Sequence, residues 1–339
     1  MFGTESPPEA KAGIEDVDLD GRTALVTGST SGLGREAALA LGRLGASVLV
    51  HGRNREAGER VVDELEAVGA DARFVAADFE RPAAVSALAD AVGEEFDGLD
   101  VLCNNAGGLF QDGGETELGV ERTFHINHLS PYQLTAELLP HLSAGARVVT
   151  TASVGHRIAT LNLDRLATLA GLSPWAAYCR SKLANVLFAN ELARRLVAAG
   201  RNVTSNSLHP GIVPGSEFSR ALPAPAERIG DLIGEFPMTD SVADGAATVC
   251  YLAAAPEVEG VTGSYYARCR DRRPAPDAPT STPSGGSGAG APRCSTSRSR
   301  WPTPSRSERS PKRPSLHRPA VGSRSVCGTG TIRRVEEGR

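Results

Sequence analysis

The sequence has few features of membrane, secreted or metal-binding proteins. No stretch approaches 18 consecutive apolar residues, so a membrane-spanning helix is excluded. The first twenty residues are polar and acidic, without the basic-then-apolar order of a secretory signal. The six cysteines form no CxxC pair and no zinc-ligand spacing, which favours reduced thiols. We therefore expect a cytoplasmic protein without a membrane anchor or a bound metal.

Lysine is scarce, and charge is unevenly distributed along the chain. Only Lys11, Lys182 and Lys312 are lysines among 36 basic residues, which indicates GC-rich coding or salt adaptation more than function. Residues 1–267 carry 20 basic and 35 acidic residues, whereas residues 268–339 carry 16 and 5. The acidic character of the larger part argues against nucleic acid as the main partner.

Composition changes sharply near Arg268. The last 72 residues hold 12 Ser, 10 Pro and 8 Gly, without helical or strand periodicity, so they bury too little apolar area to offset the entropy of ordering. We expect a polar N-terminal extension over 1–20, one domain over 21–267 and a disordered basic tail over 268–339. The abrupt onset of the tail fits a shifted reading frame, a basic tail that binds an anionic surface, or an inert extension.

Within the domain, short apolar strands alternate with helical stretches. The expected strands are Thr23–Thr27, Ser47–Val50, Arg73–Ala76, Val101–Cys103, Arg147–Thr151, Asn202–Leu208 and Gly263–Tyr266. The expected helices are Gly32–Leu44, Arg55–Val68, Ala83–Phe96, Asn127–Leu142, Pro174–Ala199 and Ser241–Ala254. This order predicts an α/β fold, a doubly wound (Rossmann) parallel sheet of about seven strands covered on both faces. Ligands of such sheets bind at the carboxyl ends of the strands.

Three glycines follow the first strand and open a helix, in TGSTSGLG at residues 27–34. Gly28 would permit a tight turn, Gly32 would let the backbone approach a pyrophosphate, and Gly34 would let the helix pack close to the sheet. Free N–H groups at the helix N-terminus would face the phosphates. The spacing is G-x3-G-x-G rather than G-x-G-x-x-G, and a Gly/Ser turn without a ligand is the alternative.

Further motifs follow in order, and together they resemble the classical short-chain dehydrogenase/reductase family. NNAG at 104–107 follows the fourth strand, YCRSK at 178–182 lies in a long helix, and PG at 210–211 follows the sixth strand. The finer pattern, including HGRN, SVGHR and LHPG, is similar to the retinol-dehydrogenase-like branch. The resemblance implies an NAD(P)-dependent oxidoreductase that acts on a small-molecule alcohol or carbonyl compound.

The resemblance also implies a catalytic set of Asn127, Ser153, Tyr178 and Lys182. Tyr178 and Lys182 share a helix face, and a nearby ammonium would lower the pKa of the phenol. Tyr178 can then exchange a proton with the substrate oxygen, while Ser153 hydrogen-bonds that oxygen. Asn127 would hold a water of the proton relay, and Lys182 would reach the nicotinamide ribose. Taken singly, the four also fit structural roles on a helix face or as caps.

The end of the second strand distinguishes NADP from NAD. An NAD enzyme usually presents an acidic residue there for the ribose hydroxyls, but the sequence reads His51-Gly52-Arg53-Asn54. Arg53 can pair with a 2′-phosphate, and Arg55 is a second candidate. The alternative is that Arg53 is one more arginine of an Arg-rich chain. We expect NADP(H), with NAD(H) less favoured.

The motifs assign a set of residues to the cofactor. They are Gly28, Ser29, Ser31, Gly32, Leu33, Gly34, Arg53, Asp78, Asn105, Ala106, Gly107, Tyr178, Lys182, Pro210, Gly211 and Val213. By the resemblance, Asp78 contacts the adenine; a role near a helix N-terminus is the alternative.

Leucines between Ser153 and Tyr178 and the segment Pro214–Pro237 are expected to border the site. Apolar walls favour a lipophilic alcohol or carbonyl substrate, although these leucines also fit an ordinary core. Two other functions stay open. A non-catalytic NADP-binding regulatory protein is disfavoured by the complete catalytic set. An extended-type sugar-nucleotide epimerase or dehydratase is disfavoured by the glycine spacing and the short region after Pro210. The sequence is also compatible with a homo-oligomer.

Overall fold

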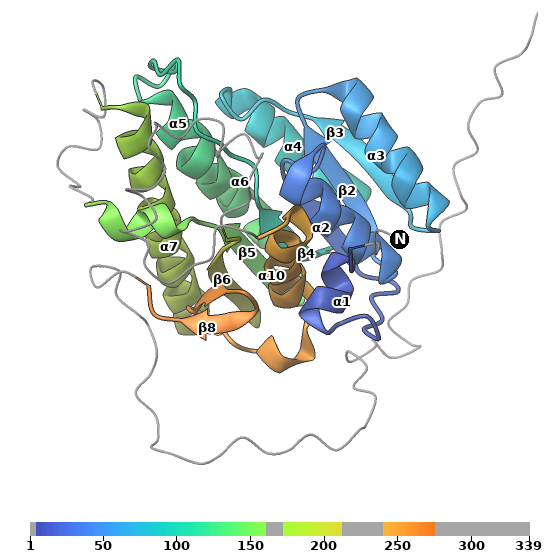
Figure 1. Ribbon diagram of the computed structural model, residues 1–339. Coiled ribbons are helices and arrows are strands. Elements are labelled where there is room, and N and C mark those ends of the chain that lie inside the picture. The colour runs from blue at the N-terminus through green and yellow to red at the C-terminus, as the bar shows by residue number, and fades with distance from the viewer. Residues whose placement is uncertain (1–4, 161–171, 212–239, 275–339) are drawn as a thin grey trace, which may run out of the picture. The chain divides into compact units, whose positions relative to one another are not determined.

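The protein is built on one eight-stranded sheet (Figure 1). The structure is a computed structural model and describes residues 5–160, 172–211 and 240–274. The strands are β1 (Thr23–Val26), β2 (Ser47–Gly52), β3 (Ala72–Ala76), β4 (Leu99–Asn104), β5 (Leu142–Thr151), β6 (Val203–His209), β7 (Tyr265–Ala267) and β8 (Arg270–Arg272). Their order is β3-β2-β1-β4-β5-β6-β7-β8, with every pair parallel except β7 and β8. The predicted doubly wound sheet is confirmed.

Helices cover both faces of this sheet (Figure 1). The longer helices are α2 (Gly32–Arg43), α3 (Arg55–Ala67), α4 (Pro82–Glu95), α6 (Ser130–Leu138), α7 (Pro174–Ala198) and α10 (Val242–Ala254). In β1, Ala24 and Val26 pack in the core that holds α2, α3 and α10, whereas Leu25 packs with α4, α6 and α7. Because both faces are buried, β1, β2 and β4 each hold three consecutive apolar residues rather than an alternating pattern.

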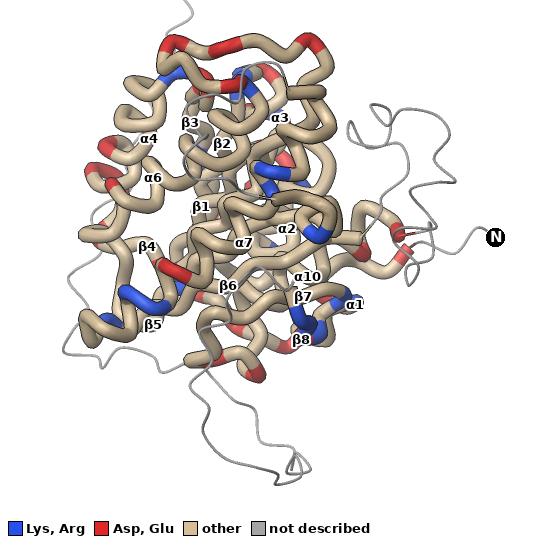
Figure 2. Tube along the Cα trace, turned by 90° about the vertical axis from the view of Figure 1, so that its left-hand side faces the viewer, with Lys and Arg blue, Asp and Glu red and all other residues tan. Residues whose placement is uncertain are grey.

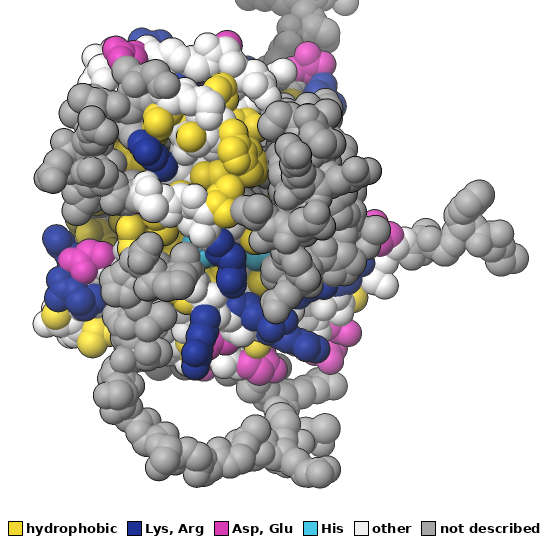
Figure 3. All heavy atoms as spheres, turned by 60° about the vertical axis from the view of Figure 1, so that its left-hand side comes forward, with side chains coloured by type: hydrophobic (Ala, Val, Ile, Leu, Met, Phe, Trp, Pro, Cys, Tyr) yellow, Lys and Arg dark blue, Asp and Glu magenta, His cyan; other side chains and the backbone are white. Residues whose placement is uncertain are grey.

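The antiparallel strand β8 lies beyond the domain end expected at residue 267. Arg268 and Cys269 adopt left-handed φ angles of 52° and 57°, and this tight turn folds β8 back onto β7. The β8 residues are exposed and charged, so no apolar pattern in the sequence predicts this strand. Figure 2 shows basic residues at β8, and a space-filling view shows Lys and Arg side chains close together on one face (Figure 3). Charged edge strands discourage pairing with other chains.

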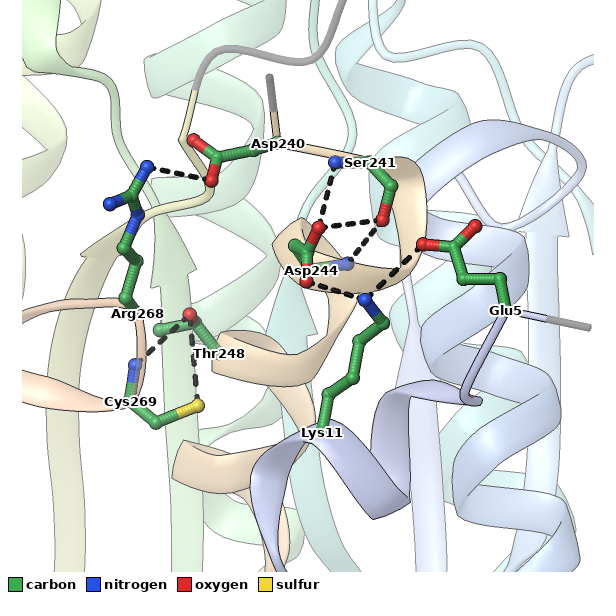
Figure 4. Close-up of polar contacts among 8 residues, drawn as sticks. All are labelled: Glu5, Lys11, Asp240, Ser241, Asp244, Thr248, Arg268 and Cys269. Atoms are coloured by element: carbon green, nitrogen blue, oxygen red, sulfur yellow. Dashed lines mark hydrogen bonds and ion pairs between the residues drawn. The ribbon is translucent and has the colours of Figure 1, made fainter. Parts of the chain in front are cut away.

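The expected N-terminal extension packs against the domain. Its short helix α1 (Pro8–Ala12) contacts α2 and α10. Arg43 donates to both carboxylate oxygens of the buried Glu9, at 2.5 and 2.8 Å. Lys11 donates to Asp244 at 2.7 Å, within the capping box that opens α10 (Figure 4). Glu9 and Lys11 therefore hold the segment to α2 and α10 through ion pairs.

Most of the expected tail, from residue 275 onward, lies outside the described residues. Within the described ranges, no helix is long and apolar enough to cross a membrane, and no group of three or more His, Cys, Asp or Glu side chains is arranged to hold a metal ion.

Candidate active site

The glycine-rich turn leaves no room for side chains at two positions. Gly28 has a φ of +67°, and a Cβ there would lie 2.8 Å from the Ala106 Cα atom. A Cβ on Gly34 would lie 2.4 Å from the Gly28 carbonyl oxygen. The exposed Ser31 precedes α2 without capping it through its side chain. This close-packed turn at an uncapped helix N-terminus fits a pyrophosphate.

Thr27 connects the glycine-rich turn to the NNAG loop. Its hydroxyl donates to the Cys103 carbonyl at 3.0 Å and accepts from the N–H groups of Asn105 and Ala106 at 2.9 and 3.0 Å. The Asn105 amide donates to the Thr27 carbonyl at 3.0 Å. Thr27 was not among the predicted site residues, although it is the first residue of the TGSTSGLG motif.

Two predicted cofactor residues face different surroundings at this turn. The Ser29 hydroxyl is buried, donates to the Val26 carbonyl at 2.7 Å and accepts from the His51 N–H at 3.0 Å. Its side chain therefore stabilises the turn from within. Leu33 instead packs so closely against α10 that a Cβ on Gly245 would lie 2.4 Å from the Leu33 Cδ1 atom.

Ser153, Tyr178 and Lys182 meet beyond the end of β5. Ser153 follows that strand and caps a short 3-10 helix, η3 (Val154–Ile158), by accepting from the Gly155 N–H at 3.2 Å. Tyr178 and Lys182 lie one turn apart on α7, and both are buried. The Ser153 and Tyr178 side chains are hydrogen-bonded. The Lys182 Nζ atom lies 5.6 Å from the centre of the Tyr178 ring and donates to the Thr151 carbonyl at 3.1 Å.

Burial dominates the protonation of this group. It raises the pKa of Tyr178, while the hydrogen bond with Ser153 acts in the opposite direction. Lys182 was expected to lower the pKa of Tyr178, but in the protein alone this pKa is raised. Removal of the phenolate from water outweighs the neighbouring charge. Burial also lowers the pKa of Lys182 to about 8. The ammonium form of Lys182 thus still predominates at neutral pH.

Asn127 lies in a π-helical turn, η1 (His125–Leu129), rather than at the start of a regular helix. Its Oδ1 atom accepts from the Gly108 N–H at 2.9 Å, and its Nδ2 atom donates to the Gly108 carbonyl at 2.9 Å and to the Ser181 hydroxyl at 3.0 Å. Ser181 in turn donates to the Tyr178 carbonyl at 2.7 Å. Such π turns occur frequently at functional sites.

Asn185 and Ser181 are two polar residues of α7 that the sequence analysis did not assign to the site. The Asn185 amide donates to the main-chain carbonyls of Asn127 and Thr151, at 3.0 and 3.2 Å. Asn185 and Ser181 lie seven and three residues after Tyr178, and this helical spacing could have indicated both.

The remaining predicted residues lie around this centre. Arg53 is exposed, and none of the described residues forms a hydrogen bond or ion pair with its side chain. Arg55, by contrast, pairs with Glu59 at 3.2 Å. The Asp78 carboxylate accepts from the Glu80 N–H at 3.1 Å, at the turn that follows β3.

Pro210 and Gly211 follow β6. Gly211 has a φ of +91°, and a Cβ there would lie 2.3 Å from the Asp240 carboxylate. That carboxylate accepts from Arg268 at 2.8 Å (Figure 4). Val213, the segment 214–237 and most of the leucines expected to border the site lie outside the described residues.

Comparisons with known proteins agree with this arrangement. The short chain dehydrogenase family profile matches residues 22–225. The chain is 40% identical over 259 residues to the polyprenol dehydrogenase of Mus musculus, covering 72% of this chain and 75% of that protein. It is 37% identical over 276 residues to Mus musculus retinol dehydrogenase 14, covering 77% and 81%. A short chain dehydrogenase from Burkholderia cenocepacia J2315, solved in complex with NADP, has a TM-score of 0.60 and 29% identity, covering 73% of this chain and 96% of that one.

The chain therefore belongs to the short-chain dehydrogenase family, and it is an oxidoreductase of that family. Its similarity to retinol dehydrogenase 14 and polyprenol dehydrogenase further assigns it to the retinol-dehydrogenase-like branch. Solved relatives in complex with NADP and NADPH support a nicotinamide cofactor.

Buried histidines predict a loss of stability in mild acid. Burial lowers the pKa of His51, His128, His156 and His209 to about 4, against about 6.5 in the unfolded chain. The unfolded chain thus binds more protons below about pH 6.5, so stability present above that pH is lost as pH falls towards 4. We expect the free energy of unfolding from urea titrations to fall by several kcal/mol between about pH 6.5 and 4.

The exposed His141 supplies the control. His141→Gln should leave the pH profile unchanged. A wild-type unfolding free energy that stays constant between about pH 6.5 and 5 would contradict the expectation.

Proposed function

We propose that the protein transfers a hydride between NADP(H) and a lipophilic alcohol or carbonyl substrate, with Tyr178 as the general acid and base. The observation that carries this proposal is the buried Ser153–Tyr178–Lys182 group, which lies at the same sheet edge as the glycine-rich turn. The family membership supports it independently.

The chain supplies binding and proton chemistry. Gly28, Ser31 and the first N–H groups of α2 would hold the pyrophosphate, and Lys182 would hold the nicotinamide ribose. The nicotinamide cofactor, when bound, donates or accepts the hydride. In the reductive direction Tyr178 gives its phenolic proton to the substrate oxygen; in the oxidative direction the Tyr178 phenolate takes a proton from the alcohol.

Two neighbours prepare the phenol for this exchange. The Ser153 hydroxyl lowers the pKa of Tyr178 against the effect of burial, and it can also donate to the substrate oxygen as charge develops there. The Lys182 ammonium compensates the phenolate charge in a low-dielectric setting, where such a charge is costly. Asn127 and Asn185 hold the adjoining backbone, and Asn127 would hold a relay water.

The choice of NADP(H) is supported by Arg53. Its side chain is exposed and uncommitted among the described residues, it follows β2 directly, and no acidic residue stands there to repel a 2′-phosphate. The lipophilic substrate is supported by the names of the relatives, since polyprenol and retinol are apolar alcohols. A cytoplasmic location is supported by Cys103, Cys179, Cys250 and Cys269, which are free thiols.

Turnover can be assayed with NADPH and a panel of carbonyl compounds. We expect measurable NADPH oxidation with medium-chain and aromatic aldehydes and little with small charged carbonyl compounds, because the apolar walls that the sequence predicts would exclude charge. NADPH binding without turnover of any compound, in either direction, would favour the regulatory alternative. Activity confined to charged substrates would overturn the lipophilic assignment.

Tyr178→Phe tests the proton transfer, because the ring remains and only the transferable proton is lost. We expect kcat to fall by at least about 100-fold, as for a lost general acid, with NADPH affinity retained. Tyr132→Phe is the matched control, since Tyr132 is 53% exposed on α6, and it should keep wild-type turnover. Lys182→Ala should lose both turnover and affinity. Near-normal turnover of Tyr178→Phe would refute the mechanism.

Arg53→Asp tests the cofactor preference. The new carboxylate should repel the 2′-phosphate and accept from ribose hydroxyls, so kcat/KM should shift towards NADH by about 10-fold or more, the equivalent of one charged contact. Arg55→Asp, at a residue already paired with Glu59, should change the ratio less. The assignment fails if the wild type already has the higher kcat/KM with NADH.

A further inference from the structure

We propose that His51 is a positioning residue for the cofactor site, where its neutral imidazole fixes the glycine-rich turn in the conformation that receives the dinucleotide. The inference rests on the proposed function. His51 lies near the end of β2, two residues before Arg53, and only 2% of it is exposed. The side chain therefore has almost no surface to offer a bound dinucleotide, so its effect must pass through the residues that it contacts.

The imidazole joins two loops that are separate in the sequence. Its Nδ1 atom accepts from the Gly28 N–H at 3.2 Å, and its Nε2 atom lies 3.2 Å from the Ala77 carbonyl oxygen. A carbonyl oxygen only accepts, so Nε2 carries the proton and Nδ1 is the free acceptor. One neutral tautomer therefore satisfies both hydrogen bonds at once.

The Thr27–Gly28 peptide is consequently held on both sides. Its carbonyl oxygen accepts from the Asn105 amide at 3.0 Å, and its N–H donates to His51. Gly28 has a left-handed φ of +67° and no space for a Cβ. A rotation of this peptide would therefore break two hydrogen bonds and bring the turn against Ala106.

The contribution of the side chain is separable from that of the backbone. The His51 carbonyl accepts from the Ser29 N–H at 2.9 Å, and the His51 N–H donates to the Ser29 hydroxyl at 3.0 Å. Any residue other than proline can keep these two bonds at position 51. Only the side chain adds the bonds to Gly28 and Ala77.

The surroundings keep the ring neutral and in place. His51 stacks on Phe79, with ring centres 4.6 Å apart and planes at 27°. Burial lowers the pKa of His51 to about 4, against smaller opposing effects of the hydrogen bond to Ala77 and of the Asp78 charge. A proton on Nδ1 would set a donor against the Gly28 N–H. Phe79 and Asp78 follow β3, so the same ring also orders the loop assigned to the adenine.

Two substitutions separate the two hydrogen bonds. In His51→Asn the amide oxygen can replace Nδ1 and accept from Gly28, but the side chain is too short for Ala77. In His51→Gln the amide nitrogen can replace Nε2 and donate to Ala77, but no acceptor remains for Gly28. Each variant loses one hydrogen bond, so each is the stability control of the other in thermal unfolding.

The test measures NADPH dissociation constants, steady-state kinetics and amide hydrogen exchange of the cofactor-free protein. We expect His51→Gln to raise Kd and KM for NADPH by about 10-fold, the size of one lost hydrogen bond, with kcat at saturating NADPH within about twofold of wild type. Exchange at Gly28 should accelerate. His51→Asn should remain within about threefold of wild type in Kd and retain protection at Gly28.

Equal effects of the two variants, or no effect of either, on a wild type that binds NADPH would overturn the role of His51 and leave the proposed function intact. A wild type that binds neither NADPH nor NADH would overturn both. A fall in kcat with unchanged KM in His51→Gln would also contradict the inference, because a positioning role at the turn acts on binding.

Discussion

The close approach of the glycine-rich turn to the NNAG loop is the constraint on which the site depends. A Cβ on Gly28 would lie only 2.8 Å from the Ala106 Cα atom, and Thr27 makes hydrogen bonds to the loop with both its hydroxyl and its carbonyl. This contact is available because β1 and β4 are parallel neighbours and end at the same edge. Parallel pairing thus brings loops far apart in sequence to one site.

Burial shifts the ionisation of both Tyr178 and Lys182 in the proposed catalytic group. A low-dielectric setting raises the pKa of Tyr178 and lowers that of Lys182, so both side chains are biased towards their neutral forms. The proton exchange proposed for Tyr178 needs a phenolate beside an ammonium instead. Ser153, the Thr151 carbonyl and the short distance between the two side chains supply the compensation that water would otherwise give.

Sequence patterns predicted the sheet, the motifs and the family, because β1, β2 and β4 each hold three consecutive apolar residues and the motif residues are local. They did not predict β8, whose residues Arg270–Arg272 carry no apolar signal. The π turn at Asn127 was also missed, since the apolar spacing over one turn is similar in α and π helices. Contacts such as Gly28 with His51, 23 residues apart, depend on strand order, which a single sequence does not specify.

The NNAG loop contacts both the glycine-rich turn and the group around Asn127 and Tyr178. At its start, Asn105 hydrogen-bonds Thr27 and fixes the turn assigned to the pyrophosphate. At its end, a Cβ on Gly107 would lie 2.6 Å from the Asn127 Oδ1 atom, and Gly108 makes two hydrogen bonds to the same amide. Asn127 then continues through Ser181 to the backbone of Tyr178. Because close-packed interiors transmit displacements, a shift of this loop would disturb the proposed cofactor site and the proposed catalytic group together.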